Sequence, residues 1–257
     1  MDVVRLGTRG AIGELLLHRP EKLNALSSQM LEQLIGAASW FDQQRDVKVV
    51  VIRGAGRAFT AGADISPLGS TPTEGGDGSS RGGLDLGPRM IEAIAGMRAL
   101  TIAAIHGHCI GGGVVLATAC DIRYAAQGTR FSIPEVDLGI PLTWGGIPRL
   151  VRELGPALAK ELVLTCRPFD AEEAQRMRLI NRVVPLAQLE TEAFALAEKL
   201  ASQPAYSLEL TKRHANAVAE EAGSTAEASR EVELLLAALR DSESQQALGC
   251  YLASRAR

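Results

Sequence analysis

Hydrophobic and polar positions change their spacing along this chain, and the change divides it into two parts. Up to Trp144, short apolar runs such as Val47–Ile52 alternate with segments whose apolar residues repeat with helical spacing. The first pattern is typical of buried strands and the second of amphipathic helices. The predicted elements are a hairpin of strands 3–6 and 11–18, helices over 27–45, 86–97 and 114–119, and strands over 47–52, 100–105, 121–125 and 129–133. This alternation predicts an α/β core.

After Trp144 the spacing is helical throughout. The predicted helices cover residues 150–165, 171–178, 188–201, 206–221 and 227–239. Asp170 followed by Glu173 fits a capping box at the start of the second of these helices. We therefore expect a β-rich core followed by an all-helical tail. The stretch Ser66–Gly87, rich in glycine, serine and threonine, is expected to be a surface loop beside the binding site.

Composition narrows the class of protein. With 257 residues, 46% of them hydrophobic, the chain can bury a large core without a disulfide or a metal. A net charge of −3 argues against a nucleic-acid-binding protein. The four cysteines lie far apart, which is typical of reduced, buried thiols in a cytosolic protein. Neither a signal-peptide pattern nor an apolar run of about 18 residues is apparent, so we expect a cytoplasmic protein without a membrane span.

Motifs for common cofactors are not matched. Gly54–Gly56 follows a predicted strand, but Phe59 stands where a dinucleotide fingerprint needs its last glycine. No P-loop occurs. His106, His108 and Cys109 are metal-ligand types, and alternation on one strand would put both imidazoles on one side. Because no acidic third ligand is near, we expect two ordinary half-buried histidines and no metal site.

Two glycine-containing segments are more informative. Ala58–Ile65 follows a buried strand, and Ile110–Gly113 stands at the start of a predicted helix. Free N–H groups at a helix start bind negative charge, and the helix dipole adds to this attraction. Two N–H donors from separate segments can form an oxyanion hole. A tight turn with close helix packing is the alternative interpretation of each segment.

Five motifs are spread over nearly the whole chain: His18–Leu26, Ala61–Ile65, Ile105–Gly113, Cys120–Arg123 and Phe131–Ile140. Their order and spacing resemble the crotonase, or enoyl-CoA hydratase/isomerase, superfamily. The resemblance implies a ββα spiral core with the acyl-CoA site in residues 1–195. It also implies a C-terminal helical region, residues 196–257, that forms a homotrimer or a dimer of trimers. The implied ligand is an acyl-CoA thioester, with coenzyme A as part of the substrate and no separate cofactor.

The same resemblance implies roles for particular residues. The thioester carbonyl would lie between the backbone N–H groups of Ala63 and Gly112. The implied CoA-binding residues are Lys22, Ala25, Ala61, Asp64 and Ile65. Lys22 would supply charge and Ala25 a backbone carbonyl to the adenine, while Asp64 and Ile65 would lie beside the adenine and the pantetheine. A solvated surface lysine is the alternative interpretation of Lys22.

One departure from the family pattern bears on the reaction. Family hydratases use two glutamates; the second is present as Glu135, but the first position holds Val115, which cannot transfer a proton. Some relatives carry a further acid eight positions after this glutamate, where this chain has Thr143, beside Trp144. We expect Val115, Thr143 and Trp144 at the acyl pocket. A dry pocket would raise the pKa of Glu135 and strengthen it as a base.

A single carboxylate can take a proton from the α-carbon of a thioester and return it elsewhere on the acyl chain. We therefore expect Δ3-to-Δ2 enoyl-CoA isomerisation through an enolate held in the oxyanion hole. One alternative is 2-enoyl-CoA hydration with Glu135 alone activating water. Another is a non-catalytic acyl-CoA binding or carrier protein. For Glu135 itself, the alternative is a structural carboxylate that caps a nearby helix.

Overall fold

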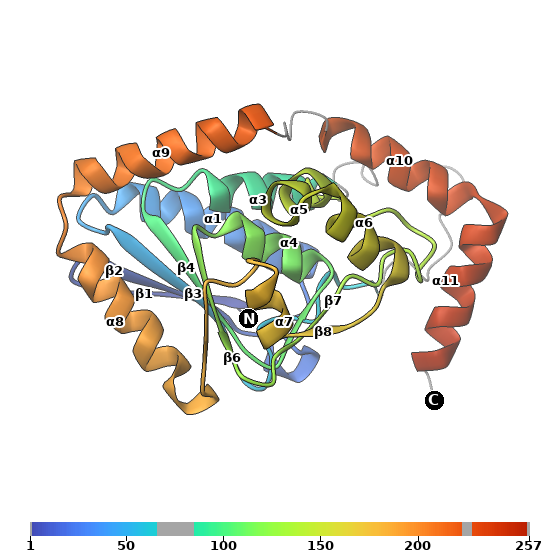
Figure 1. The fold of residues 1–257 in the computed structure, drawn as a ribbon, viewed down its shortest axis with the longest axis horizontal. Helices are drawn as coiled ribbons and strands as arrows, with labels where there is room; N and C mark the ends of the chain where they lie inside the picture. Colours follow the sequence, from blue (N-terminus) through green and yellow to red (C-terminus); the bar gives the residue numbers. More distant parts are fainter. Residues whose placement is uncertain (1, 66–84, 223–227, 256–257) are drawn as a thin grey trace.

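Two β-sheets carry the fold, and the larger lies at the centre of the molecule (Figure 1). The structure is a computed structural model that describes residues 2–65, 85–222 and 228–255. Within these residues the sheets have the strand orders β1-β2-β3-β4-β6-β9 and β5-β7-β8. The strands are β1 (Val4–Arg9), β2 (Ile12–Leu17), β3 (Val49–Gly54), β4 (Leu100–Ile105), β5 (His108–Ile110), β6 (Ile122–Ala126), β7 (Arg130–Ser132), β8 (Phe169–Asp170) and β9 (Arg182–Val184).

The helices follow the predicted pattern in the first part of the chain. They are α1 (Ser28–Gln43), α3 (Leu86–Ala95), α4 (Gly112–Ala119), α5 (Gly146–Leu154), α6 (Pro156–Thr165), α7 (Ala171–Arg176), α8 (Leu189–Ala201), α9 (Ala205–Ala222), α10 (Ala228–Arg240) and α11 (Ser242–Arg255). Ser27 caps α1 by accepting a hydrogen bond from the Met30 N–H. Asp170 caps α7 in the same way, with 2.8 Å to the Glu173 N–H.

Helices cover both faces of the large sheet, which explains why its central strands β3 and β4 are almost wholly apolar. On one face, Val49, Val51 and Ile102 pack with Leu189 and Ala193 of α8. The opposite face packs against α1, α3 and α4 in the main core. Helix α9 runs across the molecule from α8 toward α10, and α10 and α11 form an outer arm that ends at the C-terminus (Figure 1).

Strand direction brings the glycine segments to one edge of the large sheet. Strand β1 is antiparallel to β2, whereas β2, β3, β4, β6 and β9 are parallel. The carboxyl ends of parallel strands meet at the same edge, where α/β proteins form their ligand sites. The Ala58–Ile65 segment follows β3, and Ile110–Gly113 follows β4 through the short strand β5. The fold therefore places these two segments beside each other.

The predictions for the tail differ from the structure in three respects. Two short strands, β8 and β9, return from the tail to the sheets. The single helix expected over residues 150–165 is split at Gly155, which has φ +77° and precedes Pro156. Helix α11 was not predicted at all. The division after residue 195 remains a prediction; residue 195 lies within helix α8.

Candidate active site

Three chain segments lie side by side where β3 and β4 end. Leu26 pairs with Ala63 in a parallel β-bridge, with its N–H 2.8 Å from the Gly62 carbonyl oxygen. Thr60 pairs in the same way with Cys109. The Thr60 hydroxyl also donates to the Asn24 carbonyl oxygen at 2.7 Å. We call residues 60–64 and 108–113 the donor segments, because they contain the two backbone N–H groups expected to bind the thioester oxygen, those of Ala63 and Gly112.

Two N–H groups of the donor segments are free to bind a ligand. Among the described residues, no group accepts a hydrogen bond from the Ala63 or Gly112 N–H. Gly62 has φ +86°, and a Cβ there would overlap the Ile110 carbonyl oxygen and lie 3.7 Å from the Gly112 nitrogen. Only glycine permits this approach. The fold thus brings together the two donors expected from the sequence, and Gly112 is the first residue of α4.

Glu135 lies against the start of α4. It follows β7 in the loop of residues 133–145, which we call the acid loop. A Cβ on Gly111, whose φ is +50°, would overlap Glu135 Oε1 and lie 3.4 Å from Oε2. Oε2 is buried and has no hydrogen-bond partner in the parts of the chain that the structure describes. Burial raises the pKa of Glu135 to about 7, against a smaller lowering effect of its own backbone N–H. Such a carboxyl can accept and return a proton near neutral pH.

The acid loop also brings Trp144 to the donor segments. A Cβ on Gly112 would overlap the indole ring, and so would a Cβ on Gly87 at the start of α3. Val115 lies deeper: its side chain is 1% exposed and packs into the main core. Its Cγ2 would be 2.9 Å from a Cβ on Gly146. Thr143 is half-buried, and its carbonyl oxygen accepts a hydrogen bond from the Gly146 N–H at 3.1 Å.

The segment expected to hold coenzyme A is an ordered turn. A 3-10 helix, Pro20–Lys22, is followed by Leu23 and Asn24 with φ +51° and +55°. Asn24 is fully buried; its Oδ1 accepts from the Arg19 N–H, and its Nδ2 donates to the carbonyl oxygens of Ala55 and Ala58. These bonds tie the turn to the strand end. The sequence analysis missed Asn24, although asparagine is among the few residues that tolerate left-handed backbone.

The other predicted CoA-binding residues surround this turn. Lys22 is exposed, and the half-buried Ala25 offers its carbonyl oxygen to the Arg19 guanidinium at 3.3 Å. Asp64 forms an ion pair with the same guanidinium at 2.6 Å. The Ala61 N–H bonds to the Leu23 carbonyl oxygen at 2.9 Å, and Ile65 is half-buried. The structure therefore groups all five residues, with Arg19 as an anchor that the sequence analysis missed. Of the predicted Ser66–Gly87 loop, residues 66–84 lie outside the described residues.

The two histidines do not form the pair expected from alternation on one strand. Strand β4 ends at Ile105, and Gly107, with φ +64°, turns the chain before His108 begins β5. His106 Nε2 lies 2.9 Å from the Gly56 carbonyl oxygen, whereas the His108 side chain is exposed. Within residues 2–65, 85–222 and 228–255, no group of three or more His, Cys, Asp or Glu residues is placed to hold a metal ion.

The cysteines are unpaired, and one differs from expectation. Cys109, Cys120 and Cys166 are buried, and burial raises the pKa of each of these thiols. Cys250 on α11 is exposed, so the prediction of buried thiols is wrong for this residue. None of the four thiols contacts the free donors or the Glu135 carboxylate through a hydrogen bond in the described parts of the chain.

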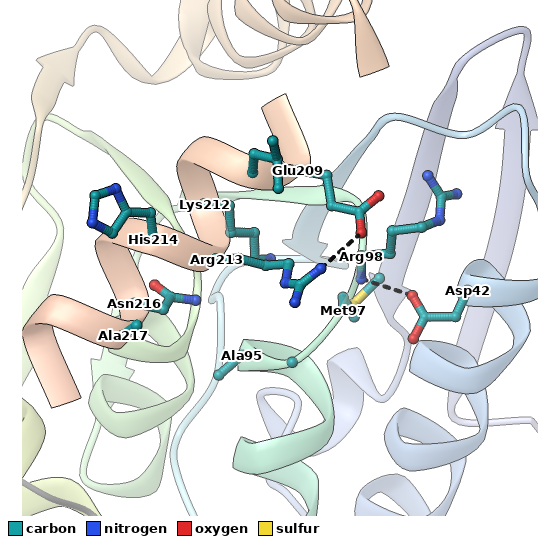
Figure 2. A pocket seen from close by; sticks show the side chains of 12 residues that line it. Asp42, Ala95, Met97, Arg98, Glu209, Lys212, Arg213, His214, Asn216 and Ala217 are labelled. Atoms are coloured by element: carbon teal, nitrogen blue, oxygen red, sulfur yellow. Dashed lines mark hydrogen bonds and ion pairs between the residues drawn. The ribbon is translucent and has the colours of Figure 1, made fainter. Parts of the chain in front are cut away.

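A cavity of about 710 Å³ lies away from the donor segments, beneath α9 (Figure 2). Its lining includes Asp42, Arg98 and Arg213, beside the start of β4 rather than its end. Lys212, also in the lining, is 6% exposed and bonds to the Ala99 carbonyl oxygen and the Asp121 carboxylate. These bonds fasten α9 to the sheet.

No helix in the described ranges has the length and apolar character needed to cross a bilayer.

Paired N–H donors beside a buried carboxylate define a site that can stabilise an oxyanion while a proton moves. Residues 7–256 match the family model of enoyl-CoA hydratase/isomerase. The chain belongs to this family, within the crotonase superfamily, and is an enzyme of this type acting on acyl-CoA. The fold is therefore the mixed α/β crotonase fold that the sequence resemblance implied.

Similarity to known proteins extends along most of the chain. It is 41% identical over 191 residues to a peroxisomal Δ(3,5)-Δ(2,4)-dienoyl-CoA isomerase of Arabidopsis thaliana, covering 71% of this chain and 69% of the relative. It is 35% identical over 217 residues to a short-chain-enoyl-CoA hydratase of Clostridium acetobutylicum, covering 84% and 82%. A crystal structure of an enoyl-CoA hydratase/isomerase from Mycobacterium paratuberculosis superposes with a TM-score of 0.88 at 25% identity, covering 97% and 98%.

Proposed function

We propose that this enzyme shifts a double bond from the Δ3 to the Δ2 position of an enoyl-CoA, with Glu135 as its only acid–base group. The observation that carries this proposal is Oε2 of Glu135, which is buried beside Gly111 and has no partner within residues 2–65, 85–222 and 228–255. Its pKa of about 7 suits a group that must both take and return a proton. The place of a second glutamate holds Val115, packed in the core.

The reaction has two proton transfers. The Glu135 carboxylate removes a proton from C2, and the C–H electron pair forms an enolate whose oxygen accepts hydrogen bonds from the Ala63 and Gly112 N–H groups. The enolate then collapses to form the C2=C3 bond, and the former C3=C4 pair takes the proton from Glu135 at C4. Each oxyanion donor contributes about 3 kcal/mol of transition-state stabilisation in comparable sites. Atoms and electrons balance within the substrate, so no redox cofactor is required.

The ordered turn after β2 supports a place for the rest of the substrate. We assign Lys22, Ala25, Ala61, Asp64 and Ile65 to coenzyme A, and Thr143 and Trp144 to the acyl pocket, with Val115 behind it. Arg19 links Ala25 and Asp64, so it would keep this surface in shape. We further propose that the enzyme acts in the cytoplasm as a homotrimer or a dimer of trimers, with coenzyme A entering only as part of the substrate.

Hydration of a 2-enoyl-CoA is the second candidate, because the Clostridium acetobutylicum relative is named a hydratase. In that case Glu135 alone would activate water. Replacing Val115 by glutamate would then restore the missing acid and raise hydration strongly. Val115 lies in the main core beside Gly146, so a glutamate there would also loosen the core.

Purified enzyme given 3-enoyl-CoA and 2-enoyl-CoA substrates in separate assays tests the proposal. We expect turnover of the 3-enoyl substrate to exceed hydration, and Glu135→Gln to lower kcat by about 10³-fold because the amide cannot take a proton. Asp137→Asn is the matched control, since Asp137 is an exposed carboxylate of the same loop. Full activity of Glu135→Gln, or hydration as the faster reaction, would contradict the proposal.

A further inference from the structure

Glu231 joins the C-terminal helices to the acid loop. It lies in the first turn of α10, and its Oε2 accepts a hydrogen bond of 2.8 Å from the Gly145 N–H. The two residues are 86 positions apart in the chain. The Glu231 side chain is half-buried, and burial raises the pKa of its carboxyl above the ordinary value. The reaction proposed above gives this carboxylate no role.

The acid loop needs a stabilising contact at this point because its backbone adopts an unfavourable conformation at Trp144. Trp144 and Gly145 both have left-handed backbone, with φ +63° and +69°. A bulky residue rarely adopts this conformation and keeps it only where its surroundings hold it. Gly145 also precedes α5, whose first turn contains no acidic residue. Glu231 therefore supplies an acceptor for the Gly145 N–H and a negative charge at the start of α5, where the helix dipole favours one.

The residue next to this bond contacts the proposed oxyanion hole. The Trp144 indole lies so close to Gly112 and Gly87 that a Cβ on either glycine would overlap it. Trp144 thus stands over the residue whose N–H is one of the two free donors. A shift of the Trp144 backbone would move the indole relative to the Gly112 N–H.

The C-terminal arm touches the acid loop at a second place. Gly139, four positions after Glu135, has φ +71°, and a Cβ there would overlap the Ser244 backbone at the start of α11. The arm of α10 and α11 therefore contacts the loop both at Gly139 and at Gly145. Of these two contacts, the bond from Glu231 is the one made by an ionisable side chain.

We propose that Glu231 is a positioning residue, which through the Gly145 N–H holds the Trp144 indole against Gly112 and so shapes the acyl pocket beside the oxyanion donor. The proposal rests on the proposed function only in what it says of turnover. The placement of Trp144 can be measured without any substrate. The proposed role of Glu231 gives the C-terminal arm, α10 and α11, a direct part in organising the site.

The chain offers a spectroscopic test because it contains only two tryptophans, Trp40 and Trp144. In a Trp40→Phe background, Trp144 is the only indole fluorophore. Three variants at Glu231 separate the possible effects. Glu231→Ala removes the acceptor, Glu231→Asp keeps the charge but shortens its reach by one methylene, and Glu231→Gln keeps an acceptor without the charge. Glu233→Ala is the matched control, since Glu233 is exposed on the same helix.

We expect Glu231→Ala and Glu231→Asp to shift the Trp144 emission to longer wavelength and to increase its quenching by acrylamide. With 3-enoyl-CoA, kcat should fall about tenfold while KM changes less than about threefold, because a small displacement at a catalytic site has a large effect on rate. Glu231→Gln should restore both readouts, and Glu233→Ala should leave them unchanged.

Two results would overturn the proposal. One is Trp144 emission in Glu231→Ala that matches Glu233→Ala; the other is a Glu231→Gln variant as impaired as Glu231→Ala. Circular dichroism confirms that each variant is folded, and Glu231→Asp remains informative if Glu231→Ala does not fold. Shifted emission without turnover of any enoyl-CoA would support the positioning role and refute the proposed reaction instead.

Discussion

The acid loop contacts the donor segments at Gly111 and Gly112, and the two regions are built in different ways. In the donor segments the groups that face the site are backbone N–H groups, held by β-bridges and by glycines without room for a Cβ. In the acid loop the working group is one side chain, Glu135, whose Oε2 is buried and has no hydrogen-bond partner among the described residues. The loop keeps left-handed backbone at Trp144 and a bond to α10.

The donor segments therefore contribute backbone geometry to the site, and the acid loop contributes proton transfer. The donor segments depend on glycines, whose lack of a side chain lets the backbones pack closely. A substitution that disturbs this packing should also displace the N–H donors. The acid loop depends on the environment of a single carboxyl, which is less stable when charged than it would be in water. Substitutions in the donor segments should therefore lower activity and stability together, whereas substitutions of Glu135 should separate the two.

The largest effect is expected at Gly111. Gly111→Ala would place a Cβ on the Glu135 carboxylate and force alanine to adopt φ +50°. We expect kcat to fall by about 100-fold or more and the melting temperature to drop. Gly36→Ala is the control, because Gly36 is exposed within α1 with nothing near its Cβ position, and should stabilise by about 0.5–1 kcal/mol without loss of activity. Unchanged activity of Gly111→Ala would contradict the view that the donor segments depend on close packing around their glycines.

The second prediction is a gain of stability from an inactive variant. Burial raises the pKa of Glu135 from 4.5 to about 7, so the folded protein holds a proton that the unfolded chain releases. Stability is therefore lost as pH rises from 4.5 to about 7. Glu135→Gln removes this loss, and should be more stabilising at pH 8 than at pH 5 by about 2 kcal/mol. Denaturant titrations at both pH values measure it; equal effects would show that Glu135 is not desolvated.

The smallest effect is the pH dependence of activity. A base with a pKa of about 7 must be ionised to act, so kcat/KM should rise through pH 7 and level off above it. Below that pH, the slope should be about tenfold per pH unit. His108→Gln, at an exposed histidine of β5, should leave the profile unchanged. A flat profile between about pH 6 and 8 would argue that another group carries the proton.

Much of the fold could be predicted because its elements have strong local signals. The β-branched run before Gly54 and the Ser27 cap of α1 each identify an element from a few neighbouring residues. The β8 and β9 strands could not be found in this way, since two or three residues acquire strand character only by pairing with β7 and β6. The split at Gly155 and Pro156 was visible in the sequence but was overlooked.

The residues of the candidate site likewise fall into those that local sequence identifies and those that it does not. Glu135, Ala63 and Gly112 lie in motifs that can be read directly, and the valine at position 115 stands two residues after one of them. Arg19, Asn24 and Glu231 were missed because their roles depend on contacts with residues distant in the chain. The histidine pair was misplaced because the turn at Gly107 ends one strand and begins another.

By itself, the sequence determined the order of most elements, the resemblance to the enoyl-CoA hydratase/isomerase family and the lack of an acid at position 115. These features depend on residue type and local spacing. Only the tertiary structure decided which N–H groups stay free, how far the Glu135 carboxyl is removed from water and which helix end reaches Gly145. Burial and long-range contact arise when distant segments pack together, and the pKa of a carboxyl follows from that packing.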